Sequence, residues 1–432
     1  MFAPVPSVYD GIVKVLLLGS GGREHAIAWS LSRSPLLTKL WAAPGSDAMA
    51  ALAERVDLEA LDPDAVARFA RENGVELVFI GPEAPLAAGV GDAARAAGVP
   101  VFGPSKAAAR LETSKAFAKD FMARHAIPTA RSLCCEGTAA AKDAARALGG
   151  KCAVKADGLA AGKGVIVCRA FPEAEAAVDL LCATTAGKTL IVEELLDGPE
   201  LTVMVLTDGR ACAVLPPSRD HKRLHDGDQG PNTGGMGALA PAPVPAGTWK
   251  RIMDEILAPT MAGLTDDGLD YRGALYAGIM LTQAGPKLLE YNARFGDPET
   301  QAVLPLLDAD LLTLARDCAM GELIAGVIPA KPGACVAITL ASPGYPDSTK
   351  AGTPLDLSGA EGLTGVLIFH AGTQRGAKGW IATGGRVLTV VGRGTDLADA
   401  RARAYAAVAA LQVPGLHYRR DIAAKALGRT VA

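Results

Sequence analysis

Short apolar runs alternate with helical sequence along the first hundred residues. Ile12 to Leu18 is almost wholly apolar, and Glu76 to Ile80 ends in a second such run. Runs of this kind are typical of strands that are buried on both faces of a parallel sheet. A glycine follows each run, and helical sequence follows the glycine. This alternation predicts a doubly wound α/β unit over residues 12–112.

The rest of the chain changes character several times, and the changes predict four further segments. They are a helical linker (113–132), a compact, glycine-punctuated α+β segment (133–203), a segment of strands with a long polar loop (204–334) and a small α+β domain (335–432). Two strands of the third segment, Gly273 to Leu281 and Lys287 to Arg294, are expected to pair through the short turn between them. The predicted fold class is a multidomain chain of α/β and α+β parts.

The second of these paired strands carries polar side chains on one face. Successive side chains of a strand point to opposite faces, which places Glu290, Asn292 and Arg294 together. A carboxylate and an amide oxygen are ligands that Mg²⁺ accepts, usually with substrate phosphates completing its shell. A neighbouring arginine can grip phosphate or carboxylate through two N–H groups. The pattern predicts a metal and phosphate site, with an ordinary solvated strand face as the alternative.

A glycine turn follows the first strand and opens a helix, at residues 19–25. The dinucleotide-binding fingerprint requires a glycine at position 24, where this chain has Glu24. Unpaired amides at such a helix start bind anions, and Arg23 adds positive charge. The turn therefore favours a phosphate-bearing substrate over NAD, with a tight structural turn as the other interpretation.

A second glycine-rich turn lies between two predicted strands, from Lys155 to Val165. Its spacing is not that of a P-loop, because three residues rather than four separate Gly158 from Gly162. Gly164, rather than Ser or Thr, follows the lysine, and a strand rather than a helix comes next. The pattern predicts a flap whose amides close over phosphates, or else a simple glycine-rich hairpin.

Two polar segments further along give weaker signals. An apolar strand leads into an acidic turn with Glu193 and Glu200, which suits either an adenine and ribose contact or a solvated loop. The loop from Ser218 to Gly237 is long, charged and rich in glycine, which implies that its backbone approaches a ligand closely. His221 and His225 lack the helix that would make them a metal pair, so we interpret them as loop histidines. No nucleophile–base constellation emerges.

Composition adds mainly exclusions. The net charge is −3, and no apolar run reaches the roughly 20 residues that span a bilayer, so neither nucleic-acid nor membrane binding is expected. The eight cysteines show no metal-ligand spacing and lie mostly in apolar segments, as reduced thiols do. The first ten residues lack the basic and apolar regions of a secretory signal. A soluble, cytoplasmic protein is expected.

Together these motifs resemble those of the ATP-grasp ligases and, more narrowly, of the phosphoribosylamine–glycine ligase (glycinamide ribonucleotide synthetase) family. The resemblance runs from Val13 to about Ile422. The segments that carry it are Leu18 to His25, Gly81 to Leu86, Gly103 to Lys106, Ser114 with Lys115, Lys155 to Val165, Asp220 to Arg223, Gly230 to Ala238, and Glu290 to Thr300. In combination they are far more specific than any one of them.

The resemblance implies an ATP-dependent carboxylate–amine ligase of de novo purine (IMP) biosynthesis. Such an enzyme joins glycine to 5-phosphoribosylamine through glycyl phosphate, giving glycinamide ribonucleotide, ADP and phosphate. The implied ATP-grasp fold makes residues 133–203 the lid and residues 204–334 the central subdomain. ATP and Mg²⁺ or Mn²⁺ are the expected cofactors, and a monomer is expected. Positioning and charge neutralisation carry this chemistry, so no protein nucleophile is needed.

The same resemblance implies roles for individual residues. Glu290 and Asn292 would hold the metal. Arg294 would act on the transferring phosphate or the carboxylate, and Asp220 would lie near glycine. Lys115 and Lys155 would contact the phosphates of ATP, and the flap residues Gly158, Gly162, Lys163 and Gly164 would close over them. Glu193 and Leu195 would border the adenine, and Glu200 would bind the ribose. The residues expected on the phosphoribosylamine side are Gly22, Arg23, Glu24 and Glu83.

Two departures from the family pattern limit these expectations. Many ATP-grasp enzymes carry a further acidic metal ligand on the preceding strand, but Ala277 to Thr282 offers none. Fewer protein ligands, or a second ion held mainly by phosphates, are therefore expected. After Gly45 the family often has an asparagine, whereas this chain has Ser46 and Asp47. A substrate contact at that loop is less expected for this reason.

Three other functions remain open. The nearest is another ATP-grasp ligase, such as an aminoimidazole ribonucleotide carboxylase or a formate-using transformylase, although the Asp220 to Ala238 loop argues against both. A non-catalytic nucleotide-binding regulator would bind ATP without needing glycine. A dehydrogenase is disfavoured by the broken glycine fingerprint.

Overall fold

The N-terminal part of the chain forms a doubly wound parallel sheet, as predicted. The computed structural model describes residues 13–159, 164–183 and 189–428. Five parallel strands lie in the order β3-β2-β1-β4-β5. The elements are β1 (Val13–Gly19), α1 (Gly22–Leu31), β2 (Leu37–Pro44), β3 (Glu54–Arg55), α2 (Pro63–Glu72), β4 (Leu77–Ile80), α3 (Glu83–Ala88), α4 (Val90–Ala96) and β5 (Val101–Phe102). Leu16, Leu17 and Leu18 of the central strand are fully buried, which explains the apolar run.

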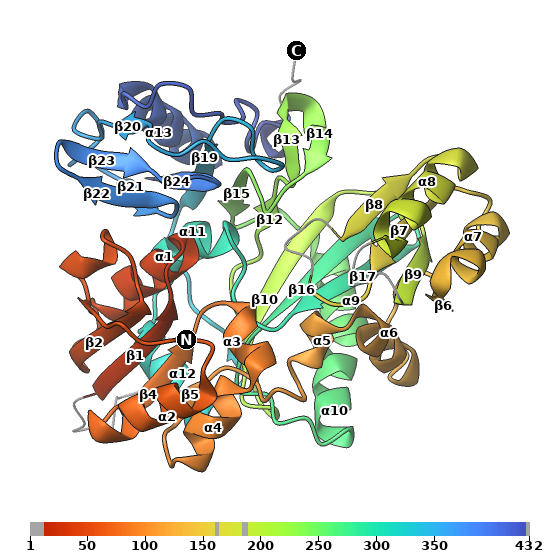
Figure 1. Cartoon of the computed structure of the whole chain (residues 1–432), viewed down its shortest axis with the longest axis horizontal. Helices are drawn as coiled ribbons and strands as arrows, with labels where there is room; N and C mark the ends of the chain where they lie inside the picture. The colour runs from red at the N-terminus through yellow and green to blue at the C-terminus, as the bar shows by residue number, and fades with distance from the viewer. Residues whose placement is uncertain (1–12, 160–163, 184–188, 429–432) are drawn as a thin grey trace.

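A second sheet forms the unit at the right of Figure 1. Its four antiparallel strands lie in the order β6-β9-β7-β8. The elements are β6 (Ser132–Glu136), α7 (Gly137–Ala147), β7 (Cys152–Ala156), β8 (Val165–Cys168), α8 (Phe171–Cys182) and β9 (Thr189–Glu194). Val154, Val178 and Val192 contribute to a core that belongs to this unit alone.

The central sheet carries the predicted polar strand at its edge. Its order is β17-β16-β10-β11-β18. The strands are β10 (Glu200–Thr207), β11 (Cys212–Val214), β16 (Gly273–Thr282), β17 (Gly285–Asn292) and β18 (Gly326–Val327). The associated helices are α5 (Arg110–Thr113), α6 (Lys115–Arg124), α9 (Ala246–Ile252), α10 (Ala258–Asp266), α11 (Glu299–Val303) and α12 (Leu311–Met320). Strands β16 and β17 form an antiparallel hairpin closed by Thr282 and Gly285, so the predicted pairing is confirmed.

The C-terminal sheet incorporates strands from the middle of the chain. Its order is β12-β15-β19-β24-β21, beside a smaller sheet in the order β20-β23-β22. The elements are β12 (Arg219–Asp220), β15 (Gly237–Ala240), β19 (Ala334–Ala341), β20 (Pro354–Leu355), β21 (Val366–His370), β22 (Thr373–Gly376), β23 (Gly379–Ala382), β24 (Arg386–Gly394) and α13 (Leu397–Ala410). A hairpin of β13 (Arg223–His225) and β14 (Gln229–Asn232) projects from it.

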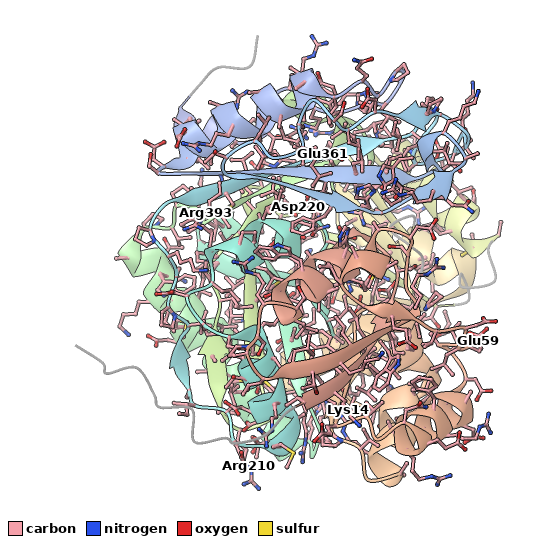
Figure 2. The ribbon with its side chains drawn as sticks, turned by 90° about the vertical axis from the view of Figure 1, so that its left-hand side faces the viewer. Lys14, Glu59, Arg210, Asp220, Glu361 and Arg393 are labelled. Carbon is pink, nitrogen blue, oxygen red and sulfur yellow. The ribbon has the colours of Figure 1, made fainter. Side chains whose placement is uncertain are left out.

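The N-terminal, β6–β9 and C-terminal sheets are arranged around the central sheet. The N-terminal sheet lies at the lower left of Figure 1, the C-terminal strands lie above it, and the central sheet joins both to the unit at the right. From the side, Asp220 lies in the middle of the molecule, whereas Glu59 and Arg210 lie at its periphery (Figure 2). The predicted segment boundaries stay predictions: β10 runs across the one between residues 203 and 204, and β12 and β15 share a sheet with β19. Within the described ranges, no helix is both long and apolar enough to cross a bilayer.

Candidate active site

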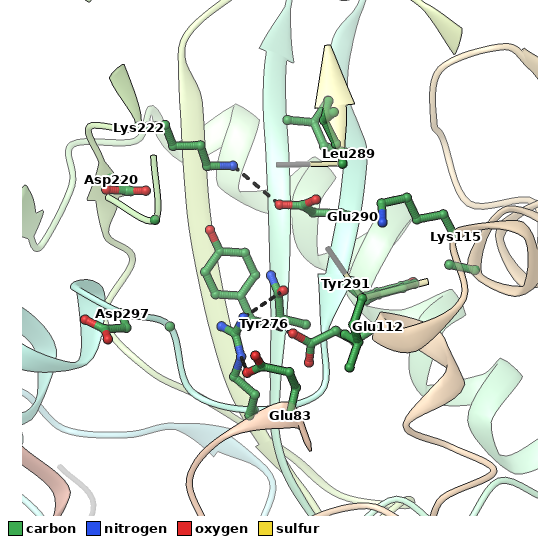
Figure 3. Close-up of a pocket in the computed structure, with 18 of the residues that line it drawn as sticks. Glu83, Glu112, Lys115, Asp220, Lys222, Tyr276, Leu289, Glu290, Tyr291 and Asp297 are labelled. Carbon is green, nitrogen blue, oxygen red and sulfur yellow. Dashed lines mark hydrogen bonds and ion pairs between the residues drawn. The ribbon is translucent and has the colours of Figure 1, made fainter. Parts of the chain in front are cut away.

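The polar face of β17 points into a cavity. Glu290, Asn292 and Arg294 all line a hollow of about 530 Å³, to which the N-terminal, central, β6–β9 and C-terminal parts each contribute residues. Figure 3 shows Glu290 in this hollow, between Lys222 and Lys115. Tyr291, between Glu290 and Asn292 in sequence, is buried, and its hydroxyl oxygen lies 2.5 Å from Oγ1 of Thr260.

All three predicted polar groups line the same cavity, as do Leu289 and Tyr291. The predicted strand was too long, however: β17 ends at Asn292, so Arg294 reaches the cavity from the turn after the strand and not by strand alternation.

Three lysines determine the charge state of Glu290. Lys222 places its Nζ 3.4 Å from Oε1 of Glu290, and it also lies 3.0 Å from Oε2 of Glu200. Burial favours the neutral acid, but Lys222, Lys155 and Lys115 together lower the pKa of Glu290 to about 2. The carboxylate is therefore ionised at neutral pH and available to a cation.

Glu290 and Asn292 fit a hard divalent cation. They supply one carboxylate and one amide oxygen, and Oδ1 of Asn292 accepts a hydrogen bond from Nη2 of Arg294 at 3.2 Å. Among the residues that the structure describes, no group of three or more His, Cys, Asp or Glu side chains could hold a metal. An ion at this position would complete its shell with water and phosphate oxygens, as Mg²⁺ commonly does.

Arg294 is held between two carboxylates. Its Nη2 lies 2.9 Å from Oε1 of Glu112, and its Nε lies 3.4 Å from Oε2 of Glu83. Burial raises the pKa of Glu112 despite this contact. Burial acts in the same direction on Glu83, but Arg294 and Arg23 outweigh it and lower the pKa of Glu83. Arg294 lies two residues beyond the end of β17, and no spacing in the sequence reveals these two partners.

The predicted ATP lysines lie at the junction of α6 with the glycine flap. Lys115 donates from Nζ to the carbonyl oxygen of Gly158 at 2.9 Å. Lys155 and Lys119 lie 3.0 Å and 3.2 Å from the two carboxylate oxygens of Glu193, whose side chain is buried. Burial lowers the pKa of Lys119 to about 8. Gly158 and Gly164 line the cavity, whereas the predicted contacts Gly162 and Lys163 lie outside the described residues.

A second cavity of about 600 Å³ adjoins the first. Lys155, Glu193, Lys222 and Glu290 belong to both linings. Part of its own wall is apolar and includes Ala153, Val167, Leu195, Leu196 and Met280. The rest is mostly charged or polar and includes Glu194, Glu200, Arg219, His221, Arg223, Asp228, Asn232 and Lys425. A cavity with an apolar wall that opens toward a lysine-rich hollow matches the shape and charge of a nucleoside polyphosphate.

Asp220 lies where the two cavities meet. Burial, with the nearby Glu299, raises the pKa of Asp220 well above its ordinary value, although Lys222 opposes the shift. Its Oδ1 accepts a hydrogen bond from the amide of His221 at 2.6 Å. The side chain can therefore accept or hold a proton near a small polar ligand.

The N-terminal unit contributes to the first cavity only two of the four residues that were expected on the phosphoribosylamine side. Arg23 and Glu83 line the first cavity. Glu24 instead accepts from the amide of Gly21 at 2.8 Å and from Nε of Arg23 at 2.5 Å, so it shapes the turn and orients the arginine. An added Cβ on Gly22 would lie 3.1 Å from Nε2 of Gln301, so this glycine permits close packing against α11. Neither Gly22 nor Glu24 lines the two cavities, and their substrate contacts stay a prediction.

Several lining residues were not singled out as site residues from the sequence. They are Glu112, Lys119, Lys222, Tyr276, Asp297, Glu299, Tyr345 and Arg386. Lys222, Asp297 and Glu299 stand inside motifs that carried the resemblance, so a signal existed for them. Arg386 had none: it begins an ordinary strand, yet its Nη2 lies 2.9 Å from Oδ2 of Asp297, and its Nη1 donates to the carbonyl of Gly234 at 2.6 Å.

Three models of one family match successive parts of the chain. The phosphoribosylglycinamide synthetase N domain matches residues 13–112, and the ATP-grasp (A) domain of the same family matches residues 113–300. The C domain matches residues 335–425.

Whole proteins give the same result. The chain is 46% identical to the phosphoribosylamine–glycine ligase of Brucella melitensis over 425 residues, which is 97% of this chain and 100% of the relative. It is 46% identical to that of Streptomyces coelicolor over 427 residues, covering 96% of this chain and 100% of the relative.

Solved structures agree in fold. The crystal structure of phosphoribosylamine–glycine ligase from Thermotoga maritima superimposes with a TM-score of 0.83 at 33% identity, covering 95% of this chain and 100% of that one. A biotin carboxylase domain from Hydrogenobacter thermophilus, solved with MgADP, gives a TM-score of 0.69 at 18% identity, covering 95% of this chain and 92% of that one. The second likeness concerns the fold alone.

Proposed function

The chain belongs to the phosphoribosylglycinamide synthetase family, and from that membership we propose that it joins glycine to 5-phosphoribosylamine at the expense of ATP. The products are glycinamide ribonucleotide, ADP and phosphate, in de novo purine biosynthesis. The observation that carries the proposal is the pair of adjoining cavities, one with an apolar wall formed by residues such as Leu195, Leu196 and Met280, and one lined with lysines and acids around Glu290. They accommodate a nucleotide beside two small polar substrates.

The reaction proceeds in two balanced steps. A carboxylate oxygen of glycine attacks the γ-phosphorus of ATP, and the bond to the β,γ-bridging oxygen breaks to give glycyl phosphate and ADP. The amine of 5-phosphoribosylamine then attacks the carbonyl carbon, the amine loses a proton, and the carbon–oxygen bond to phosphate breaks. Neither step needs a protein nucleophile, because the protein contributes positioning and charge neutralisation.

ATP lies across both cavities. Its adenine fits against the apolar wall beside Glu193 and Leu195, and its ribose reaches Glu200. Lys115 and Lys155 face the polyphosphate, and the flap around Gly158 and Gly164 covers it, with Gly162 and Lys163 proposed from the sequence alone. Glu290 and Asn292 hold Mg²⁺ or Mn²⁺, which neutralises phosphate charge when bound.

The acceptor substrates lie in the first cavity. Arg23 and Glu83, which line it, face 5-phosphoribosylamine; Gly22 and Glu24 shape that side. Asp220 lies near glycine, where its acidic group suits an ammonium. Arg294, held by Glu83 and Glu112, presents fixed positive charge to the transferring phosphate or carboxylate.

We also propose that the enzyme is a cytoplasmic monomer. All eight cysteines are free thiols, as is usual in a reducing compartment. The division into an N-terminal domain (12–112), a linker (113–132), a lid (133–203), a central part (204–334) and a C-terminal domain (335–432) is retained as a working proposal.

An assay of phosphate release tests the function. Purified protein with ATP, Mg²⁺ and freshly prepared 5-phosphoribosylamine is expected to release phosphate only when glycine is added. Release that needs bicarbonate or formate instead would identify another ATP-grasp ligase. ATP binding without any release would identify a nucleotide-binding regulator, and either result would overturn the proposal.

A further inference from the structure

The loop that carries Asp220 and Lys222 into the site is held from two sides, by residues 233–240 and by a segment near the end of the chain. We call residues 219–232 the Asp220 loop; it comprises β12, β13, a short 3-10 turn at Asp226–Asp228, and β14. Asp220 and Lys222 line both cavities, and Lys222 contacts Glu200 and Glu290. The two-residue strand β12 pairs with β15, and the backbone of His221 bonds with Gly237 and Met236, which fixes the inner side of the loop. The outer part of the loop projects beyond these contacts.

A segment near the end of the described chain holds this outer part. Residues 417–425, here called the C-terminal strap, run along the Asp220 loop. Arg419 is almost fully buried, pairs with Asp421 at 2.6 Å, and lies 2.9 Å from Oδ1 of Asp228. Asp421 accepts from the amide of Gly227 at 2.9 Å, and the amide of Arg420 donates to Asp226 at 2.7 Å. The outer half of the loop is therefore fixed by charged and backbone hydrogen bonds.

His221 connects the strap to the inner half of the loop. Its Nδ1 lies 3.2 Å from the carbonyl oxygen of Gly237, which can only accept, so Nδ1 carries the proton. Its Nε2 accepts from the amide of Ala423 at 3.3 Å. This arrangement requires the neutral imidazole, and burial, together with Arg419, lowers the pKa of His221 to about 4. His221 stands directly between Asp220 and Lys222 in the sequence.

The strap is itself anchored on α13. Arg401 donates from Nε to the carbonyl of Ile422 at 2.9 Å and from Nη2 to the carbonyl of Arg420 at 2.7 Å. The hydroxyl of Tyr405 donates to the carbonyl of Arg419 at 2.8 Å and accepts from the amide of Ile422 at 3.1 Å. A continuous set of contacts thus leads from α13 through the strap to the Asp220 loop.

We propose that the C-terminal strap is a positioning element for the reaction, which acts through His221 to hold Asp220 and Lys222 where the two cavities meet. His221 takes no part in proton transfer, because both of its ring nitrogens are engaged by backbone groups. The proposal rests on the proposed function only for its kinetic assay.

The test compares His221→Ala with His221→Gln and with His125→Ala. Glutamine keeps an acceptor near the position of Nε2, and His125 is a control histidine that contacts Asp267 and Phe121 far from the strap. Misplacing a group that acts on the substrate lowers kcat, so His221→Ala is expected to lose about 10-fold or more in kcat with a KM for ATP changed by less than about 3-fold. His221→Gln should regain most of the loss, and His125→Ala should match the parent protein.

A double-mutant cycle separates positioning from stability. If His221 acts through Asp220 and Lys222, adding His221→Ala to the double variant Asp220→Asn/Lys222→Ala should lower kcat by less than about 2-fold further. Effects that multiply independently, or a kcat for His221→Ala equal to that of the parent at equal folded concentration, would overturn the proposal.

If His221→Ala does not fold, Tyr405→Phe replaces it, since only the hydroxyl is lost. This variant should lower kcat about 3-fold, and an unchanged kcat would contradict the proposal.

These outcomes are distinct from failure of the proposed function. A parent protein without glycine-dependent phosphate release would refute the function. Hydrogen exchange of the Asp220 loop amides would then test the strap, with faster exchange expected in His221→Ala than in His125→Ala. Equal exchange in both variants would refute the strap.

Discussion

Glu290 faces three lysine side chains, although the protein as a whole has a net charge of −3. Its carboxylate attracts Lys222 directly and is held ionised by all three cations. An amide at this position would keep the shape and lose the charge that both a metal and the lysines require.

Glu290→Gln is therefore expected to lower kcat by about 100-fold or more while the protein remains folded, because the variant would lose the proposed charged ligand of the metal. Glu361→Gln is the control, since Glu361 is exposed and lines neither of the two cavities. The measurement is steady-state phosphate release with a thermal melt of each variant. Turnover equal to that of the control would remove Glu290 from the mechanism.

Single residues also show how far sequence reasoning extends. Strand alternation predicts a shared face for Glu290 and Asn292, because a period of two is local, whereas Arg294 lies beyond the end of β17. The partners of Arg294 come from elsewhere in the chain, since Glu83 begins α3 and Glu112 lies in α5. Only tertiary packing brings them together, and no spacing in the sequence records it.

At the scale of elements, the flap is tied to the start of α6. Asp157 accepts from the amide of Ala116 and from Oγ of Ser114, both at 3.2 Å. The same turn offers the carbonyl of Gly158 to Lys115. The carboxylate therefore helps to cap α6 and ties the turn at Asp157 and Gly158 beside the lysines that we propose to bind ATP.

Asp157→Ala is expected to raise the KM for ATP by about 5-fold, the equivalent of a lost helix cap of about 1 kcal/mol, with a smaller effect on kcat. Asp179→Ala is the matched control: Asp179 lies on α8 of the same unit and pairs with exposed Lys142 instead. Initial rates over a range of ATP concentrations decide the matter. Equal KM values for ATP in the two variants would show that the flap does not depend on this contact.

Strand pairing can be predicted from this sequence only where the two strands lie close together along the chain. The hairpin of β16 and β17 was predictable because its strands are adjacent in sequence and joined by a short turn. The pairing of β15 with β19 was not, because the sequence Gly237 to Ala240 is rich in small residues and its partner lies almost a hundred residues later. Local pattern carries no information on such distant pairing.

At the scale of the whole molecule, two neutral histidines lie where the N-terminal and C-terminal parts meet. The amide of His370, at the end of β21, donates to Nδ1 of His25 in α1 at 3.0 Å, and the ring centroids are 5.7 Å apart. Burial lowers the pKa of His25 to about 4 and that of His370 to about 3. The helix that bears Arg23 is thus coupled to the C-terminal sheet through an uncharged contact.

Acid is expected to weaken this junction. Folding lowers the pKa of His25 from 6.5 to about 4, so between these pH values the unfolded chain binds a proton that the folded chain excludes. Stability supplied by the neutral ring is complete above pH 6.5 and declines as the pH falls toward 4. His25→Asn should therefore show a shallower fall in melting temperature than the parent over this window, with exposed His225→Asn as control. Identical slopes for the parent and His25→Asn would contradict the coupling.

The central claim is that glycine is activated as an acyl phosphate by direct attack on ATP. Glycine labelled with ¹⁸O in both carboxylate oxygens tests it, with mass spectrometry of the phosphate released in the presence of 5-phosphoribosylamine. We predict one ¹⁸O atom in each phosphate and one retained in the amide product, since the carbon–oxygen bond breaks in the second step. Phosphate without ¹⁸O, formed together with glycinamide ribonucleotide, would contradict the account.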